Sequence, residues 1–441
     1  MSNDMTKGDV FKTLLYFTVP LILSGLLQQL YYITDSIIVG NFIGEAALAT
    51  IGVSSPVLNI FIYVITGLVS GYTILISQFY GAKEYIKVSR LTNTFFVFIV
   101  ASSCLAALLG LIFKENILVL LHTPNEILNS ASDYLAIVFA GIPAVVIYNL
   151  CSSLLRGIGN SKTPLYAIVI SSIVNVALDL IFIRLFNWGI KGAAIATVIA
   201  QILSCVYLLV YIHKNYPMFK ISTNRSLIDF TLFIESMKLG LPRVIQTSVA
   251  SVGALLLQNI MNSFGIDVVT AITTAYKIDT LTILPIINIS VAISIFVGQN
   301  VGADNMARAK EGLHKGIIII LSISIAITAI VVSGGWIFMK AFGVSNSVAD
   351  IGQRFFRICA IFYPILGLEN AYGAFLQGNK DVIFSSVGNV LTLAVRVILS
   401  YTLASSLKVD VIAISEMCSW VLGAIIFYTR YKSNRWIKEP V

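Results

Sequence analysis

Gln78-Phe79-Tyr80-Gly81-Ala82 returns 221 positions later as Gln299-Asn300-Val301-Gly302-Ala303. Three further residues recur at the same offset, and they pair Pro143 with Pro364, Leu155 with Leu376, and Gly157 with Gly378. A repeat of half of the chain predicts two homologous bundles of helices. Two such bundles facing one another would enclose a central cleft, which is the geometry of alternating-access transport.

The composition indicates a membrane protein. The 441 residues are 57% hydrophobic and 11% charged, with a mean hydropathy of +0.90, whereas soluble domains carry about 25% charged residues. A helix crosses a bilayer core with about 20 apolar residues. Twelve stretches meet this length: 11–40, 46–80, 89–113, 126–155, 164–186, 189–212, 229–262, 266–299, 314–341, 354–376, 382–406 and 409–430. We therefore predict an all-α membrane protein with twelve transmembrane helices in two pseudosymmetric six-helix lobes around a central cleft.

The longest polar break divides the chain. Residues 214–226 are predicted to form a cytoplasmic linker between an N-terminal lobe, 1–213, and a C-terminal lobe, 227–441. If the N-terminus is cytoplasmic, twenty Lys and Arg fall in inner segments and seven in outer segments, as the positive-inside rule requires. We therefore expect a multi-pass protein of the plasma (inner) membrane with both termini cytoplasmic. The anionic inner leaflet then accounts for the net charge of +8, and we expect no nucleic-acid partner.

Motifs for hydrolysis are missing. The stretch 157–163 resembles a phosphate loop but has no glycine directly before Lys162, as such a loop requires. No histidine is followed by glutamate, and no G-x-S-x-G elbow occurs, so zinc-protease and hydrolase sites are not expected either. We expect no enzyme activity and no cofactor, and uphill transport would draw on an ion gradient. An intramembrane enzyme is the alternative from a different class, which an absence of turnover by the purified protein would exclude.

Polar residues on three predicted helices of the first lobe share one depth. Asp35, Asp179 and Thr197 each lie five or six residues from the outer end of their helix, or roughly 7–9 Å at about 1.5 Å per residue. Asn175 lies one turn from Asp179 on the same face. Oxygen ligands of this kind suit a hard cation such as Na⁺. Alternatively, two nearby carboxylates could hold a proton, or both acids could reach outward as interfacial residues.

The second lobe does not repeat this set. At the 221-residue offset the counterparts of Asp35, Asn175, Asp179 and Thr197 are Leu256, Arg396, Ser400 and Cys418. Ion coupling is therefore predicted in the N-terminal lobe only. Between the two ions we favour Na⁺, because several oxygens are needed to replace its hydration. Protons would compete for the same acids.

Other charges within the predicted helices have different interpretations. Arg396 and Glu416 lie on consecutive helices, and we expect a buried ion pair between them. Glu369 is a candidate for contact with a cationic substrate in the second lobe, with a packing role as the alternative. Lys277 and Asp279 lie two residues apart on one helix and face different sides, so one of them could line the cleft.

The run from Pro20 to Gly44, PLILSGLLQQLYYITDSIIVGNFIG, resembles helix 1 of multidrug and toxic compound extrusion (MATE) transporters. The paired motifs quoted above fit as well, and the resemblance to prokaryotic members covers essentially the whole chain. It implies drug efflux by cation antiport. In such members an N-lobe cation site uses an Asp on helix 1, an Asn and an Asp four apart on helix 5, and a Thr on helix 6. This pattern matches Asp35, Asn175, Asp179 and Thr197.

The resemblance also implies roles for other residues. Pro20 matches a proline that bends helix 1, and Gln28 and Asn149 match positions that line the drug cavity. Another branch keeps acids on helices 7 and 10 for Na⁺ coupling. Here Glu235 stands only at the start of helix 7 and Glu369 is displaced from the usual position, so this second ion site is not carried over.

The expected function is secondary active efflux of cationic or amphipathic drugs by antiport with Na⁺ or H⁺, by a protein that works as a monomer in the lipid bilayer. The alternative within the same superfamily is a flippase for lipid-linked oligosaccharides. Such a flippase needs several cations in its cleft for the pyrophosphate. Only Lys277, Arg396 and Arg243 are available for that purpose, which favours drug efflux.

Overall fold

The computed structural model describes residues 4–221 and 227–436. Twelve helices in these ranges are long and apolar enough to cross a bilayer, which confirms the predicted fold class. The first half of the chain contains α1 (Val10–Phe42), α2 (Glu45–Gly81), α3 (Tyr85–Leu120), α4 (Asn125–Gly157), α5 (Lys162–Asp179) and α6 (Gly189–Asn215). The second half contains α7 (Phe230–Ser263), α8 (Ile266–Gly302), α9 (Met306–Ala341), α10 (Asn346–Cys359), α11 (Tyr363–Gly378), α12 (Val382–Thr402), α13 (Ala404–Leu407) and α14 (Val411–Lys432). Residues 222–226 of the predicted linker, 1–3 and 437–441 lie outside the described residues.

The chain packs as two compact units. The first contains Leu23–Gly240, and the second contains Met5–Ile22 together with the residues from Leu241 onward. Helices α1 and α7 therefore contribute to both units. These units are defined by packing, whereas the predicted lobes were bounded by the polar break at residues 214–226, and the lobe bounds at residues 213 and 227 stay a prediction.

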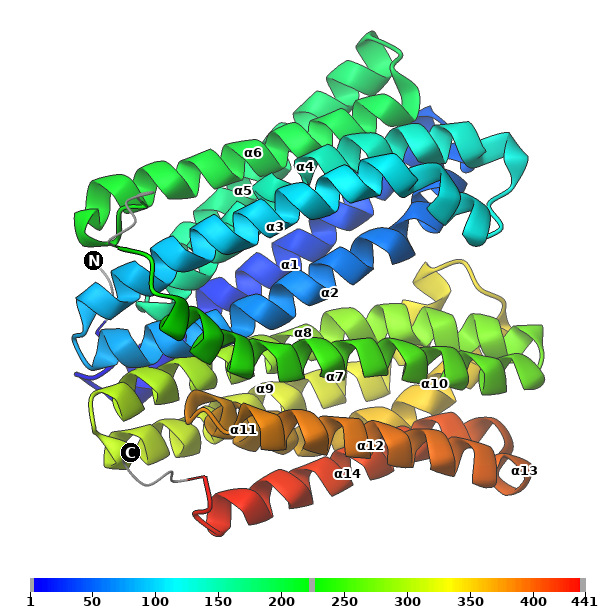
Figure 1. The fold of residues 1–441 in the computed structure, drawn as a ribbon. Helices are drawn as coiled ribbons and strands as arrows, with labels where there is room; N and C mark the ends of the chain where they lie inside the picture. Colours follow the sequence, from blue (N-terminus) through cyan, green and yellow to red (C-terminus); the bar gives the residue numbers. More distant parts are fainter. Residues whose placement is uncertain (1–3, 222–226, 437–441) are drawn as a thin grey trace. The chain divides into compact units, whose positions relative to one another are not determined.

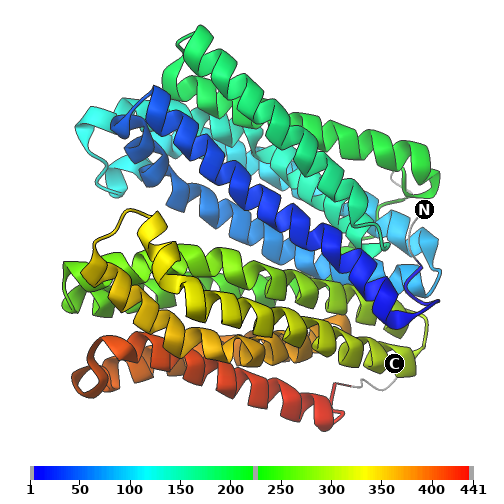
Figure 2. The same ribbon diagram turned by 180° about the vertical axis from the view of Figure 1, so that it is seen from behind.

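Each unit is a bundle of long helices. In the first unit α4 packs against α2, α3 and α6, and α5 packs against α6 (Figure 1). In the second unit α8 packs against α9 and α11, and α14, red in Figure 2, packs against α11 and α12. The described residues of both units contain no strand. Helices satisfy most backbone groups within the segment itself, as a bilayer requires.

The repeat produces the same close helix contact in both units. A Cβ added at Gly157, at the end of α4, would lie 2.6 Å from a methyl group of Ile76 on α2. A Cβ added at Gly378, at the end of α11, would lie 2.8 Å from a methyl group of Val297 on α8. Ile76 and Val297 are themselves 221 positions apart. Glycine is therefore found at both positions because no side chain fits there.

The tenth predicted span, 354–376, is wrong in its start and its continuity. It begins at Asn346 as α10 and is interrupted by a 3₁₀ turn, Ala360–Phe362, before α11. Pro364 has no backbone N–H, so the carbonyl of Ala360 loses its helical partner. The Thr328 hydroxyl of α9 donates to that carbonyl at 2.6 Å. A side chain from a neighbouring helix thus stabilises the break.

Two other predicted spans have one wrong boundary each, by about two helical turns. The span predicted at 314–341 begins at Met306, and the span predicted at 89–113 ends at Leu120. Both extensions carry charged residues such as Lys114. A helix can continue into the polar region at the membrane surface, whereas a search for apolar residues stops at the first charges.

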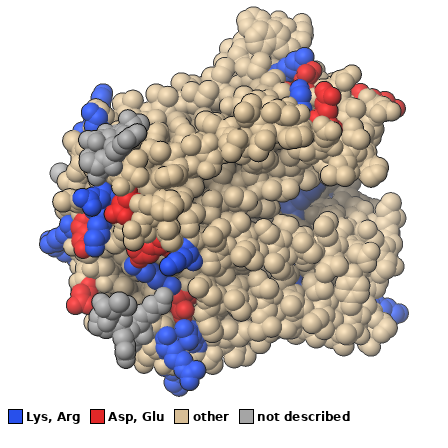
Figure 3. Space-filling view, viewed as in Figure 1, with Lys and Arg blue, Asp and Glu red and all other residues tan. Residues whose placement is uncertain are grey.

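Charged side chains gather toward the helix ends. In Figure 3 the blue and red residues lie mainly at the ends of the helices, and the sides of each unit are almost entirely tan. Charges at mid-membrane depth are expensive, so this distribution is the one expected of helices whose sides contact lipid.

Candidate ion-binding site

Three helices of the first unit position the predicted ion-binding residues. Asp35 comes from α1, Asn175 and Asp179 from α5, and Thr197 from α6, which packs against α5. Asn175 and Asp179 are each 0% exposed, and Asp35 and Thr197 are partly buried. The Asp179 side chain therefore does not reach the surface, which leaves the outward-reaching interpretation without support at this residue.

The side chains meet one another. The Asn175 amide donates to the Thr197 hydroxyl at 3.5 Å, and the Tyr31 hydroxyl donates to the same oxygen at 3.4 Å. The carboxyl groups of Asp35 and Asp179 are close enough to interact electrostatically. The structure thus brings the four predicted residues together.

Tyr31 was missed as a member of the site. It lies on α1 one helical turn before Asp35, and residues four apart on a helix share a face. That spacing was a usable signal in the sequence. A tyrosine in an apolar helix is nevertheless common, and only the contact with Thr197 distinguishes Tyr31 from the others.

Four oxygen atoms of the site are buried and receive no hydrogen bond from the described part of the chain. They are Asp35 Oδ1, Asn175 Oδ1 and both carboxylate oxygens of Asp179. A buried acceptor without a donor costs roughly 1–3 kcal/mol. A bound cation would remove that cost at all four atoms. Carboxylate and amide oxygens are hard ligands, which suit Na⁺, and a carboxylate also suits a proton.

The backbone at Asp179 is unusual. Asp179 ends α5, and the next six residues, Leu180–Leu185, form a π-helical turn. Such turns are rare and occur frequently at functional sites.

One turn beyond the acids, Ile38, Val39 and Ile183 belong to one small apolar cluster. This cluster lowers the local dielectric beside the carboxylates and strengthens their attraction for a cation.

The other predicted functional residues are spread over both units. Gln28 is exposed and Asn149 is partly buried, and both belong to the first unit. Glu369 belongs to the second unit, where it is 7% exposed and lies against Gly423. Pro20 is buried within α1, which continues through it as a helix. The substrate roles of Gln28, Asn149 and Glu369 and the hinge role of Pro20 stay predictions.

The second unit has different chemistry at the equivalent positions. Arg396 forms an ion pair with Glu416, with 2.8 Å between Nη2 and Oε2, which confirms the predicted buried pair. Ser400, the counterpart of Asp179, donates to the Ser415 hydroxyl at 2.8 Å. A guanidinium and a hydroxyl pair therefore stand where the first unit has its amide and its acid.

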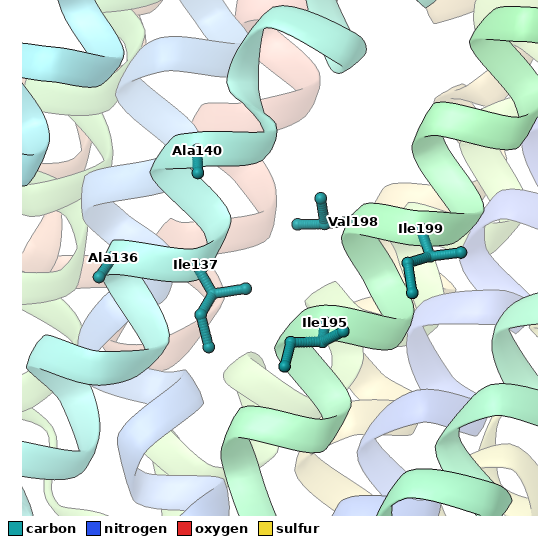
Figure 4. A pocket seen from close by; sticks show the side chains of 6 residues that line it. All are labelled: Ala136, Ile137, Ala140, Ile195, Val198 and Ile199. Atoms are coloured by element: carbon teal, nitrogen blue, oxygen red, sulfur yellow. The ribbon is translucent and has the colours of Figure 1, made fainter.

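A surface groove between α4 and α6 of the first unit offers no alternative ion site. Figure 4 shows its lining, which consists of Ala136, Ile137, Ala140, Ile195, Val198 and Ile199. Aliphatic side chains provide no ligand for an ion and match the acyl chains of lipid.

A family model described as MatE matches the chain twice, over residues 20–181 and residues 242–402. One model matching each half confirms the internal repeat, and the two segments together cover most of the chain. The chain belongs to the MATE family. MATE proteins are transporters, so this chain is a multi-pass membrane transport protein.

Relatives and solved structures agree with this assignment. The MATE chain is 27% identical to the probable multidrug resistance protein YoeA of Bacillus subtilis (strain 168), with 100% of this chain and 97% of the relative covered. It is 30% identical to the probable multidrug resistance protein YpnP of the same organism, over 85% of each chain. A solved structure of MATE in the bent conformation has a TM-score of 0.91 at 20% identity, with 97% of this chain and 96% of that chain covered. The resemblance inferred from sequence is therefore confirmed, as is the fold.

Proposed function

We propose that this MATE protein is a secondary active multidrug exporter, which moves cationic or amphipathic drugs out of the cell in exchange for Na⁺ or H⁺. The observation that carries the proposal is the group of four buried oxygen atoms without donors at Asp35, Asn175 and Asp179. Buried oxygen atoms without donors are destabilising on their own, and a bound cation would supply the missing interaction. The relatives named as multidrug resistance proteins support the choice of substrate class.

The coupling cation enters the site from the outside and offsets one of the two negative charges of Asp35 and Asp179. Drug bound from the cytoplasmic side is then released outward as the first unit rearranges around the occupied site. One net charge moved across the membrane contributes about 2.3 kcal/mol per 100 mV, which corresponds to roughly a 50-fold concentration gradient. A single coupled charge therefore supplies a useful driving force for efflux.

Na⁺ is the ion that the ligand set favours. Asp35, Asn175 and Asp179 provide four buried oxygen atoms that receive no hydrogen bond from the described residues, with the Thr197 hydroxyl beside them, and Na⁺ needs several oxygens to replace its hydration. A proton needs only one carboxylate and gains little from the amide and the hydroxyl. Protons nevertheless compete for the same acids, because protonation removes the charge that attracts Na⁺.

The orientation follows from the distribution of positive charge. Twenty Lys and Arg in predicted inner segments, against seven in predicted outer ones, favour a cytoplasmic N-terminus and C-terminus in the plasma membrane. The ligand set of the ion site lies within one chain, so a monomer suffices for coupling.

A cellular accumulation assay tests the proposal. Cells that lack their own drug exporters, and that make this protein, should accumulate less of a fluorescent organic cation than cells making the Asp35→Asn/Asp179→Asn double variant. Asp133→Asn is a matched control, because Asp133 is a partly exposed acid of the same unit, 2.9 Å from Lys191. Equal accumulation with the wild type and the double variant, at matched amounts in the membrane, would contradict the proposal.

A further inference from the structure

A second buried acid lies in the second unit, on α8. Asp279 is 4% exposed, and its Oδ1 atom accepts a hydrogen bond from the Tyr363 hydroxyl of α11. The Thr282 hydroxyl donates to the same oxygen at 3.4 Å. No donor in the described part of the chain bonds to Oδ2. Asp279 is thus held through one oxygen, while the other keeps its lone pairs.

An ion pair stands beside this acid. Arg396 of α12 and Glu416 of α14 are paired at 2.8 Å, and Arg396 also contacts Tyr276, which lies about one turn before Asp279 on α8, so the pair and the acid share one side of that helix. The Arg396 guanidinium donates to the Tyr276 hydroxyl of α8 at 3.0 Å. Cys359 of α10 completes the surroundings and donates weakly to a backbone carbonyl. The titratable groups facing Asp279 are therefore Tyr276, Cys359, Tyr363, Arg396 and Glu416.

The formal charges of this cluster do not balance. Asp279 and Glu416 contribute two negative charges when ionised, and Arg396 contributes one positive charge. Glu416 is 6% exposed, so both acids are well removed from water. An uncompensated charge in such a place costs several kcal/mol even after relaxation. The cluster therefore requires one further positive charge, which the phenol and thiol groups do not supply.

The fold itself does not require these polar groups. At the 221-residue offset, Asp279 stands opposite Leu58, Tyr363 opposite Ile142 and Glu416 opposite Ile195. The first unit thus builds the same helix arrangement with aliphatic residues at the three positions. Replacing buried ion pairs by apolar residues is often neutral or stabilising. Asp279, Tyr363 and Glu416 occur together in the second unit only. Their grouping therefore indicates that they bind a ligand rather than support the fold.

We propose that the second unit binds one exchangeable proton on Asp279, beside the Arg396–Glu416 ion pair. The proton comes from water and forms an O–H bond at Oδ2, since Oδ1 accepts the hydrogen bond from the Tyr363 hydroxyl. The Tyr363 hydroxyl directs its hydrogen at Oδ1, and this arrangement disfavours a metal cation at the same oxygen. No group of three or more His, Cys, Asp or Glu within the described ranges could hold a metal ion.

Proton binding on Asp279 removes the net negative charge of the cluster, and Arg396 then pairs with Glu416 only. Release of the proton would make Asp279 compete with Glu416 for the same guanidinium. The site therefore has two electrostatic arrangements, one for each protonation state of Asp279. A part for this site in transport rests on the proposed antiport function, whereas the proton binding itself does not.

Infrared difference spectroscopy on the purified full-length protein tests this site without any transport measurement. At neutral pH the wild type should show the carbonyl stretch of a protonated carboxyl group that is absent from Asp279→Asn and retained in Asp279→Glu. Asp350→Asn is the control, because Asp350 is an exposed acid of the same unit that accepts a hydrogen bond from Trp336 at 3.0 Å. That variant should leave the band unchanged.

The Tyr363→Phe variant provides a second reading that does not depend on removing the acid. It removes one hydrogen bond from the carboxyl group and should shift the band without abolishing it. A wild-type spectrum in both Asp279→Asn and Tyr363→Phe would overturn the proposal. Saturable binding of radioactive Na⁺ that is lost in Asp279→Asn, with no carboxyl band lost, would overturn it in favour of a metal cation.

The proton site at Asp279 and the proposed antiport function can be refuted independently of each other. If the band depends on Asp279 in a protein that shows no ion-driven efflux, the proton site stands and the proposed function is wrong. If efflux follows the ion gradients and no band depends on Asp279, the function stands and the proton site is wrong.

Discussion

Replacing Asp179 with asparagine should weaken binding of the coupling cation by about 10- to 150-fold while leaving the fold intact. Asp179 is 0% exposed, and neither of its carboxylate oxygens has a hydrogen-bond partner in the described chain. In the proposed site, the coupling cation would therefore be the main source of stabilisation for this charge. An interaction with a charged group is worth about 1.5–3 kcal/mol, and each 1.4 kcal/mol corresponds to about tenfold in affinity.

Asparagine has nearly the same shape as aspartate, so the packing of α5 against α6 should persist. Removing an unpaired buried charge should leave the stability of the cation-free protein unchanged or slightly raised. The effect should therefore appear in cation binding and not in expression or folding. Asp133→Asn, the partly exposed acid paired with Lys191, serves as the control and should bind cation as the wild type does.

The assay is thermal unfolding of the purified protein in detergent at increasing Na⁺, followed by efflux from proteoliposomes over the same range. A ligand that binds only the folded state raises the melting temperature, so the Na⁺ concentration needed for half of the shift should increase by the predicted factor in Asp179→Asn. An unchanged Na⁺ and pH dependence in this variant, in both measurements, would refute the argument from unpartnered oxygens.

Four further variants test three separate parts of the account. Ser400→Ala and Cys418→Ala should leave the ion dependence of efflux intact, and a loss of ion dependence in either would reveal coupling through the repeat positions of the second unit. Thr197→Val should reduce the Na⁺ dependence of efflux more than its maximum rate, and equal reductions would argue against a hydroxyl ligand. Thr328→Val should lower stability by about 1–3 kcal/mol, because the Ala360 carbonyl loses its donor, and an unchanged unfolding midpoint in detergent would exclude that role.

The repeat made a large part of the fold predictable. Gly157 and Gly378 are 221 positions apart. The residues that they lie against, Ile76 in one unit and Val297 in the other, are also 221 positions apart. Apolar length was enough to identify the twelve spans, because a bilayer restricts the chain to long helices. The predicted starts failed where polar turns such as the one at Met306 extend a helix beyond the apolar region.

The candidate ion site was predictable because its residues lie at similar distances from helix ends. Asp35, Asp179 and Thr197 come from three helices that a rise per residue alone can align in depth. The hydrogen bond of Tyr31 and the π turn after Asp179 were not predictable, since both depend on how neighbouring helices rotate against one another. Periodicity constrains that rotation only weakly.

The cluster around Asp279 was even harder to predict from the sequence, because it also depends on how helices rotate against one another. Its partners come from five different helices of the second unit, and Tyr363 follows a helix break that apolar length did not predict. Glu416 and Arg396 could be paired from sequence because they lie on consecutive helices. Asp279 could not be joined to them, because the link runs through Tyr276 of α8 to Arg396 of α12, and helices far apart in the sequence give no signal of such a contact.

The measurement that tests the central claim most directly is drug efflux from proteoliposomes with Na⁺ and H⁺ gradients imposed one at a time. The account predicts that an inward Na⁺ gradient alone drives efflux, that an opposing proton load slows it, and that efflux stops when both gradients are collapsed. Efflux that continues with neither gradient present, or that is unchanged in Asp35→Asn and Asp179→Asn at matched reconstitution, would contradict ion-coupled export through this site. Efflux that follows only the pH gradient and is unchanged by Na⁺ would contradict the choice of Na⁺ and make the same residues a proton site.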